Sequence, residues 1–449
     1  MGGLINAVQL ILALSILVAV HEFGHFIAAR MFGIRVDKFY IFFDAYGKKL
    51  WSKKIGDTEY GIGWLPLGGY VKIAGMIDES MDKEAMSQEP QPDEFRSKPA
   101  WQRFIVMIGG IVMNIILGVI IFAGLNKIAL KEYIVPSSME QGVVAHELGK
   151  ELGFQTGDKI VAFNGKPAKR WKDVNGLMLR LGADVTVDRN GQEITLTLPD
   201  TLLKDRRAIY GRFASVTIDT VLNKELATGD KKTKITNNYG IVEKGDKILS
   251  VNGNPVGNFN GLVEIFNENK NEEITLLIER KNKQMPVTVQ LDTAGKVGFG
   301  PSVEFNDQVK KVPYSWGSAF VFGARDGFTT IYSQVLAFGQ MFKGKLPVVE
   351  NMQSPIGIMK YFGGHWDWFR FWTLTGLISF VLAFMNILPI PALDGGHMMF
   401  LTWEMITGKA LSDKFLERAQ MVGMAILLPL MLLILLKDIY VDWISKLFG

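Results

Sequence analysis

Four long apolar stretches constrain this chain most, because each approaches the length of a membrane-crossing helix. An α-helix needs about 20 mostly apolar residues to span the hydrocarbon core of a bilayer. The second and third stretches reach that length without a charge, the fourth is shorter, and the first needs the polar positions 21–25 to complete it. The stretches are residues 4–20, 104–125, 371–390 and 421–436. The sequence therefore predicts a polytopic α-helical membrane protein with four transmembrane helices.

Basic residues at the ends of these stretches predict the orientation of the chain. Arg30 and Arg35 follow the first stretch, and Arg96 and Arg103 precede the second. Because basic residues gather on the cytoplasmic side, we expect the segment between these spans inside and the long segment before the third span outside. No charged residue precedes the first stretch and no small-residue cleavage site follows it, so we expect it to stay in place as a span.

The long outer segment contains an internal repeat. The run GDKIVAFNG at residues 157–165 recurs as GDKILSVNG at residues 245–253. Two strand-like runs follow each copy, and Asn190-Gly191, a dipeptide typical of tight hairpins, joins the first pair. The pattern resembles the PDZ domain, which binds extended peptides by strand addition. We predict two extracytoplasmic PDZ-like α+β domains; two unrelated β modules that share a turn are the alternative.

These features give a provisional domain map. Transmembrane segments are expected at residues 1–30, 104–126, 371–397 and 419–440. The other segments are a cytoplasmic loop with a small β element at 31–103, PDZ-like domains at 127–212 and 213–305, a linker region at 306–370, a cytoplasmic loop at 398–418 and a tail at 441–449. Large apolar side chains recur at roughly helical spacing between residues 320 and 338. They predict an amphipathic helix on the outer membrane surface or helices packed on the second PDZ-like domain.

The first span carries the candidate chemistry. His21 and His25 belong to an HExxH motif, and residues four apart lie on one face of a helix, so both imidazoles can reach one zinc ion. Glu22 lies beside the first ligand, where it can act as a general base toward water. Ionisable residues inside an apolar span are costly and indicate function, whereas solvated polar residues are the alternative in a soluble helix. The chain has no cysteine, so histidine and carboxylate groups must hold any metal.

Catalytic zinc usually takes three protein ligands, and we expect the third from the end of the third span. Residues 386–397 read NILPIPALDGGH. The prolines cannot continue a helix and the glycines allow sharp turns, so Asp394 is expected on irregular backbone at the level of His25. His397 is a competing ligand. Asp394 is preferred because a carboxylate completes the two-histidine, one-carboxylate set of known zinc hydrolases.

An HExxH motif in a first span, paired with NxxPxPxLDGG near the end of a later span, resembles the site-2 protease family of intramembrane zinc metalloproteases. The resemblance covers the whole chain, and the tandem PDZ-like modules match a bacterial type of this family. It implies one Zn²⁺ per chain, bound by His21, His25 and Asp394, with Glu22 as general base. It also implies a multi-pass protein of the bacterial cytoplasmic (inner) membrane, with its active site near the cytoplasm and its PDZ domains in the periplasm.

Two further elements resemble substrate-binding parts of that family. Residues 110–114 keep the Gly and Asn of its GPxxN element but have Ile111 in place of Pro, and Asn114 and Asn386 resemble its substrate-holding asparagine pair. Hydrogen bonds that join two spans are the alternative role for this pair. Residues 64–72 resemble a membrane-associated β element, in which an edge strand could pair with an unwound substrate. Its candidate residues are Gly68, Gly69 and Tyr70, with an ordinary hairpin turn as the alternative.

The resemblance implies regulated intramembrane proteolysis. Its substrates would be single-span membrane proteins, such as an anti-sigma factor or signal-peptide remnants, cut after a first protease has trimmed them, with the PDZ pair as a size filter. A membrane PDZ scaffold or receptor without proteolytic activity is the alternative, and a zinc or proton transporter is a third possibility. The net charge of +4 is scattered and forms no basic stripe, so the lipid bilayer is an expected partner and nucleic acid is not.

Overall fold

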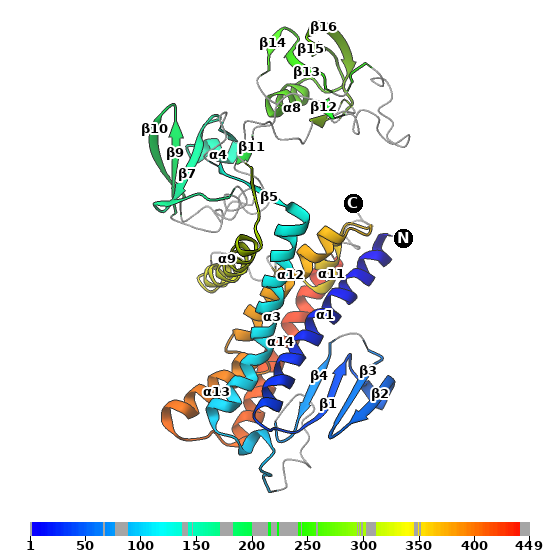
Figure 1. Cartoon of the computed structure of the whole chain (residues 1–449), viewed down its shortest axis with the longest axis vertical. Coiled ribbons are helices and arrows are strands. Elements are labelled where there is room, and N and C mark those ends of the chain that lie inside the picture. The colour runs from blue at the N-terminus through cyan, green and yellow to red at the C-terminus, as the bar shows by residue number, and fades with distance from the viewer. Residues whose placement is uncertain are drawn as a thin grey trace. The chain divides into compact units, whose positions relative to one another are not determined.

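The chain divides into two compact units, and each is described by itself. The computed structural model describes every residue except 1, 66–67, 77–88, 137–141, 146, 171–182, 200–213, 217–221, 224–240, 244, 257–258, 294, 296, 298–299, 302–310, 345–348, 350–351 and 441–449. The helical unit comprises Met1–Lys131 and Tyr314–Gly449, and the β unit comprises Glu132–Pro313 (Figure 1). The predicted tail at 441–449 lies outside the described residues.

Among the described residues, the helical unit has four helices long and apolar enough to cross a membrane, and each overlaps one of the four predicted spans. They are α1 (Gly2–Met31), α3 (Ala100–Gly124), α12 (Trp368–Ile387) and α14 (Asp413–Ile439). A π-helical turn, η3 (Leu125–Leu130), continues α3 beyond the predicted end at residue 126. The fourth helix is longer than its apolar stretch because the Ser412 side chain caps it by accepting a hydrogen bond from Phe415 N.

Glycines let α1 and α3 cross closely. A Cβ atom at Gly24 would lie 2.3 Å from Gly109 O, and one at Gly109 would lie 2.5 Å from Gly24 O. Small residues at such a crossing bring two backbones together, which is a common way of packing helices in a membrane. The crossing brings the second half of α1, with its HExxH motif, against the middle of α3.

The third span ends at Ile387, before the predicted bound at residue 397, because Pro389 and Pro391 cannot continue the helix, and the chain then starts a new helix. Helix α12 stops at Ile387, residues 388–393 are irregular, and α13 runs from Asp394 to Thr407. The prediction of a loop at 398–418 is therefore wrong as far as Thr407. The buried side chain of Leu401 packs in one cluster with Val106 of α3, and this contact supports a helix too short to be recognised as a span.

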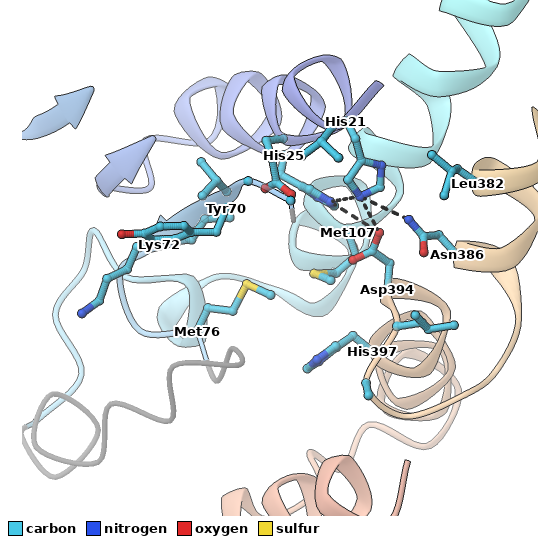
Figure 2. A pocket seen from close by; sticks show the side chains of 18 of the residues that line it. His21, His25, Tyr70, Lys72, Met76, Met107, Leu382, Asn386, Asp394 and His397 are labelled. Atoms are coloured by element: carbon cyan, nitrogen blue, oxygen red, sulfur yellow. Dashed lines mark hydrogen bonds and ion pairs between the residues drawn. The ribbon is translucent and has the colours of Figure 1, made fainter. Parts of the chain in front are cut away.

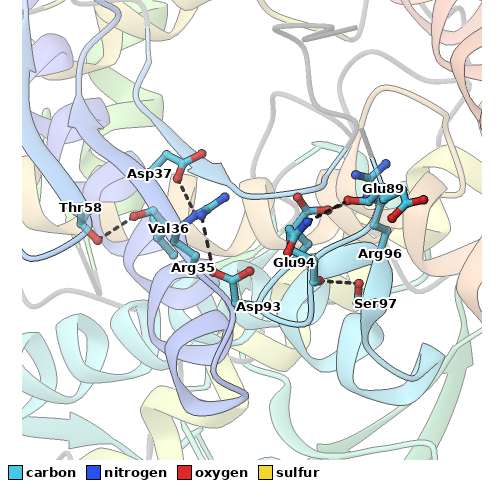
Figure 3. Close-up of polar contacts among 10 residues, drawn as sticks. Arg35, Val36, Asp37, Thr58, Glu89, Asp93, Glu94, Arg96 and Ser97 are labelled. Carbon is cyan, nitrogen blue, oxygen red and sulfur yellow. Dashed lines mark hydrogen bonds and ion pairs between the residues drawn. The ribbon is translucent and has the colours of Figure 1, made fainter. Parts of the chain in front are cut away.

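A four-stranded sheet precedes α3 in the helical unit. Its strands are β1 (Val36–Ile41), β2 (Lys49–Ile55), β3 (Thr58–Gly63) and β4 (Tyr70–Ile73), in the order β2-β3-β1-β4. Short 3₁₀ turns lie at η1 (Ala45–Gly47) and η2 (Phe95–Ser97). Arg35 links the segment before α3 to the sheet. Its side chain forms ion pairs with Asp37 of β1 at 3.1 Å and with Asp93 of that segment at 3.5 Å (Figure 3). Strand β4 is at an edge of this sheet.

The predicted helix between residues 320 and 338 is present as α9 (Trp316–Phe342). It begins with a capping box made by Ser315 and Ser318. It packs closely on α3 and α12, since a Cβ atom at Gly323 would lie 2.9 Å from Val119 O and one at Gly327 would lie 2.4 Å from the Phe380 ring. The helix is therefore part of the helical unit. Helices α11 (Pro355–Met359) and η7 (Lys360–Phe362) follow it before α12.

The β unit shows that the sequence repeat is also a structural repeat. The first copy has the strand order β8-β7-β9-β10 and the second has β14-β13-β15-β16, with all neighbouring strands antiparallel. These strands are β7 (Lys159–Phe163), β8 (Lys166–Pro167), β9 (Asp184–Arg189), β10 (Gln192–Thr197), β13 (Lys247–Val251), β14 (Asn254–Pro255), β15 (Glu273–Arg280) and β16 (Lys283–Gln290). Equivalent order in both copies argues against two unrelated modules.

The repeated Gly-Asp pair has the same role in each copy. The buried Asp158 carboxylate accepts two hydrogen bonds from Arg189, at 2.7 and 2.8 Å, and Asp246 accepts two from Arg280, both at 2.7 Å. The remaining elements are α4 (Glu147–Glu151), α8 (Phe259–Glu268), and the short strand pairs β6–β11 (Val143–Ala145, Ala214–Val216), β12–β17 (Leu222–Asn223, Gly300–Pro301) and β5–β18 (Glu132–Ile134, Lys311–Pro313).

Candidate metal centre

Both histidines of the HExxH motif lie on the face of α1 that packs on α3. Their Nε2 atoms are 3.2 Å apart, and their rings meet edge to face with centroids 4.8 Å apart (Figure 2). This is the arrangement expected from residues one helical turn apart on one face. His25 is buried and His21 is partly buried.

The structure brings Asp394 to these two imidazoles. Its Oδ2 atom lies 3.1 Å from His21 Nε2 and 3.4 Å from His25 Nε2. Asp394 is the first residue of α13, where the helix dipole favours a carboxylate, and not a residue of the irregular segment itself. The turn before it is tight, because a Cβ atom at Gly395 would lie 2.2 Å from Leu388 O and one at Gly396 would lie 2.6 Å from Ile390 O. The pairing of Asp394 with the HExxH histidines is thus present in the structure.

A backbone carbonyl of α3 determines which nitrogen of His25 carries the proton. His25 Nδ1 lies 2.8 Å from Val106 O, and a carbonyl oxygen can only accept a hydrogen bond, so Nδ1 is the protonated atom. The Nε2 lone pair then points toward His21 Nε2 and Asp394 Oδ2. Asp394 Oδ2 is buried and has no hydrogen-bond donor among the described residues. Lone pairs that converge in this way need a cation between them.

The spacing of these three atoms suits zinc. Zinc–ligand distances of about 2.0–2.2 Å in a tetrahedral site place the ligand atoms about 3.4 Å from one another. The three observed separations are 3.1, 3.2 and 3.4 Å. Three protein ligands with a fourth position left for water or substrate is the composition of catalytic zinc sites, so these residues fit the ion.

The two predicted asparagines both lie against His21. Asn114 Nδ2 is 3.2 Å from His21 Nδ1, and Asn386 Nδ2 is 3.3 Å from His21 Nε2. Asn114 Oδ1 is buried and lacks a partner among the described residues. A half-turn of the Asn114 amide would place Oδ1 against Nδ1 of His21, so that this nitrogen donates its proton and Nε2 stays available for metal. This contact orients His21 from a second helix.

Gly110 leaves the space that the imidazoles occupy. A Cβ atom there would lie 2.5 Å from His25 Nε2 and 2.6 Å from His21 Cε1. The sequence singled out this glycine only through its resemblance to GPxxN, and it gave no sign of contact with the histidines. The sequence did not predict the contact between His25 and the Val106 carbonyl, because any residue type can supply a backbone carbonyl.

Glu22 faces a cavity that contains the metal-binding atoms and the edge strand β4. The cavity has a volume of about 650 Å³, and its lining includes Glu22, the three candidate ligands and residues 68–73 (Figure 2). The backbone of Val71 in β4 lies near the Glu22 carboxylate. The candidate base and the edge strand of the sheet thus line one cavity.

The predicted residues Gly68, Gly69 and Tyr70 line the same cavity. Gly68 has φ of +152°, and a Cβ atom at Gly69 would lie 2.6 Å from Tyr40 O, so both positions need glycine. Tyr70 donates a hydrogen bond of 2.8 Å to Asp44. Burial and this hydrogen bond raise the pKa of Tyr70. Burial raises the pKa of Asp44, but hydrogen bonds from Lys38 and Tyr70 outweigh it and hold that pKa below its usual value.

His397, the competing ligand in the sequence, lines the cavity but does not join the ligand cluster. It lies one turn beyond Asp394 in α13 (Figure 2). Among the described residues the cluster with metal-ligand spacing contains only His21, His25 and Asp394. The choice of Asp394 over His397 agrees with this geometry.

Known proteins similar to this chain agree with the geometry. The family model of "Peptidase family M50" matches residues 9–430. The chain is 29% identical to "Regulator of sigma-E protease RseP" of Escherichia coli over 95% of this chain and 97% of that protein. It is 29% identical to "Protease RseP" of Yersinia pestis over the same shares. It is 27% identical to a Neisseria meningitidis protein whose name proposes a zinc metalloprotease, over 98% of each chain.

The family match extends across both the HExxH motif and the LDGG motif, and therefore across all three candidate ligands. Near-complete coverage of the relatives shows that the likeness is not confined to one domain. The chain therefore belongs to peptidase family M50, the site-2 protease family, and is a zinc-dependent metallopeptidase embedded in a membrane.

Proposed function

We propose that this metallopeptidase hydrolyses peptide bonds of single-span membrane proteins within or beside the bilayer. The observation that supports this most is the shared cavity. Three candidate zinc ligands, a glutamate and the edge strand β4 line one space inside a unit built from membrane-length helices. A soluble peptide would not require a site between such helices, whereas a transmembrane substrate does.

The chain's own residues account for the proton transfers. One zinc per chain, bound by His21, His25 and Asp394, would act as a Lewis acid toward the peptide carbonyl and lower the pKa of water at the site. Glu22 would take the proton of the attacking water and pass it to the leaving amide nitrogen. Asn386, with Nδ2 3.3 Å from His21 Nε2, is close enough to hydrogen-bond the substrate backbone beside the reacting carbonyl.

Strand β4 would present the substrate in extended form. A peptide bond in a helix is shielded because its carbonyl is internally hydrogen-bonded, so a transmembrane helix must unwind before it is cut. The outer edge of β4 can pair with the unwound segment, as in other strand-addition complexes. Gly68 and Gly69 lie just before this edge and permit close approach of a second backbone.

The name of the Escherichia coli relative describes a regulator of sigma-E, and that description applies to that protein. By analogy, this chain would cut an anti-sigma factor or signal-peptide remnants after a first protease has trimmed their outer part. The two repeats of the β unit would be tandem PDZ domains, within residues 127–212 and 213–305, that act as a size filter. Their equal strand order and equal Asp–Arg pairs support one module used twice.

The proposed location is the bacterial inner membrane, with the β unit in the periplasm and the metal centre near the cytoplasm. Basic residues at the ends of the first two spans support this orientation. A cysteine introduced at Tyr46, which is 95% exposed, should be labelled by a membrane-impermeant maleimide only after the membrane is opened. A cysteine at Lys283 in the β unit should be labelled from outside. The native chain has no cysteine to interfere.

The decisive experiment pairs zinc content with cleavage of a pre-trimmed, single-span substrate in the same membranes. Glu22→Gln should keep about one zinc per chain and lose cleavage by a factor of about 10² or more. Glu89→Gln, which changes an exposed carboxylate in the same unit, is the matched control and should cleave like the wild type. The proposal fails if Glu22→Gln cuts normally, or if the wild type leaves the pre-trimmed substrate intact.

A further inference from the structure

A second cavity in the helical unit, of about 540 Å³, lies where two membrane-length helices begin. Lys98 and Pro99 on its wall directly precede α3, and Leu411 precedes α14 by two residues. Because α3 and α14 are both long and apolar enough to cross a membrane, their first residues lie near the boundary between lipid and water. The cavity is therefore at the depth of the lipid headgroups.

Exposed tryptophans mark the same boundary. Trp101 in the first turn of α3 is 50% exposed and Trp403 in α13 is 55% exposed. Tryptophan gathers at membrane–water interfaces, where its ring meets the headgroups. These two residues support the depth assigned to the cavity from the helix ends, and they do so independently of charge.

The wall of this cavity is basic. Arg96, Lys98 and Arg103 line it, and Glu404 is the one acidic residue among the described residues of its wall. Arg103 forms an ion pair with Glu404 and donates a hydrogen bond of 3.0 Å to Lys98 O. Glu94, which is buried, lies 2.6 Å from Arg96 and offsets that charge (Figure 3). Lys98 is partly buried and forms no ion pair with any residue that the structure describes, so its positive charge is left for a ligand.

The rest of the wall is apolar. Phe400, Leu411 and Leu416 contribute side chains from α13, from the segment before α14 and from α14. A small soluble anion would use only the basic part of such a cavity. A phospholipid would use both parts, because its phosphate can meet the basic side chains while an acyl chain lies along the apolar ones.

We propose that this cavity binds an anionic phospholipid, with the headgroup phosphate at Lys98 and Arg96 and one acyl chain along Phe400 and Leu416. Basic pockets between membrane helices are known to suit such headgroups. The inference concerns lipid binding and does not depend on the proposed protein substrates. His397 lines both this cavity and the metal cavity, so the two sites share a wall on α13.

The test measures lipid bound to the full-length protein. The wild type is purified in detergent with equal amounts of phosphatidylglycerol and phosphatidylcholine, and native mass spectrometry counts each lipid retained. We expect phosphatidylglycerol to be retained several-fold over phosphatidylcholine. Lys98→Gln should lower the retention of phosphatidylglycerol about fivefold, because one basic residue near an anionic headgroup is worth about that factor.

Arg30→Gln is the matched control. Arg30 is an exposed basic residue in the last turn of α1, at the same level, since the Phe32 and Trp101 rings meet with centroids 5.4 Å apart. It does not line the cavity and should leave retention within twofold of the wild type. Ala410→Trp fills the cavity without changing charge and should also release the lipid. This second variant keeps the test valid if Lys98→Gln does not fold.

Four results would overturn the proposal. They are no preference for phosphatidylglycerol in the wild type, equal losses in Lys98→Gln and Arg30→Gln, full retention in Ala410→Trp, and displacement of the lipid by millimolar inorganic phosphate. The second would indicate general surface attraction, and the last would indicate a site for free phosphate. Zinc content, measured in parallel, confirms that each variant is folded.

Discussion

The hydroxyl group of Tyr70, the first residue of β4, donates a hydrogen bond of 2.8 Å to Asp44 Oδ1, while Lys38 Nζ lies 2.9 Å from Asp44 Oδ2. Asp44 therefore joins β4 to the segment that follows β1. The rings of Phe43 and Tyr70 are stacked, with centroids 6.0 Å apart, and support the same contact. These interactions hold the edge strand beside Glu22 and position the strand that we expect to bind the substrate.

Tyr70→Phe should weaken substrate binding without removing the chemistry. The variant keeps the stacked ring and loses only the hydrogen bond to a charged group, which is worth about 1.5 kcal/mol. We expect KM for the pre-trimmed substrate to rise about tenfold while kcat stays within about threefold. Tyr46→Phe, at an exposed position outside the cavity, should change neither. A loss confined to kcat would contradict a positioning role for Tyr70.

Residue spacing and donor chemistry together predicted the candidate metal ligands. His21 and His25 are separated by one helical turn, the prolines before Asp394 mark the end of a span, and a carboxylate completes the two-histidine set. Contacts between elements left no such signal. The Val106 carbonyl and the Gly110 backbone act at the site only because α1 and α3 cross there. Asp44 is 26 residues from Tyr70, and their contact depends on the register that pairs Tyr40 with Tyr70.

The sequence also failed to predict helix α13. The stretch after Asp394 is too short and too polar for a span, and the sequence therefore predicted a loop. Leu401 packs with Val106 and Phe95, and such tertiary contacts stabilise a helix that its own propensity does not reveal. The sequence predicted Asp394 as a site residue but did not predict that it begins a helix.

Gly110→Ala should abolish zinc binding while leaving α3 helical. Alanine favours a helix over glycine, so the backbone is not the difficulty. The new Cβ would lie 2.5 Å from His25 Nε2, and the imidazoles would have to move from their ligand positions. Zinc content measured by atomic absorption should fall from about one per chain to near zero. Gly124→Ala, in the same helix with open space around its Cβ, should retain the metal. Equal zinc in both variants would show that the imidazoles can shift without losing the ion.

The sheet before α3 should lose stability in acid through Glu59. Hydrogen bonds from Lys49, Ser52 and Tyr40 lower the pKa of Glu59 from 4.5 to about 2. Because the folded pKa is the lower one, the contribution is complete above pH 4.5 and disappears as the pH falls through about 2. Hydrogen-exchange protection of β2 and β3, corrected for intrinsic rates, should fall over this range. Lys49 is exposed to solvent, so the effect should be small and weakened further by salt.

Glu59→Gln provides the comparison for this pH dependence. In this variant the hydrogen-exchange protection of β2 and β3 should not fall in acid. At about pH 2 it should equal the protection in the wild type. Asp57→Asn, in the turn of the same hairpin, is the control and should keep the transition, since Asp57 forms no ion pair with the described residues. An acid transition that persists in Glu59→Gln would assign it to another carboxylate.

Substitutions of Asn114 and Asn386 test which of the two asparagines positions His21 for zinc and which binds the substrate. If Asn114 fixes the tautomer of His21, Asn114→Leu should weaken zinc affinity by about 10- to 100-fold, as loss of an outer-shell partner typically does. Asn114→Asp should restore much of it, because a carboxylate also accepts the proton of Nδ1. Asn386→Leu should instead retain zinc and raise KM, because its amide faces the space where the substrate backbone is proposed to lie. Zinc affinity from competition with a chelator separates the two roles from cleavage itself. Equal zinc affinity in Asn114→Leu and the wild type would leave Asn114 as a contact between α1 and α3 only.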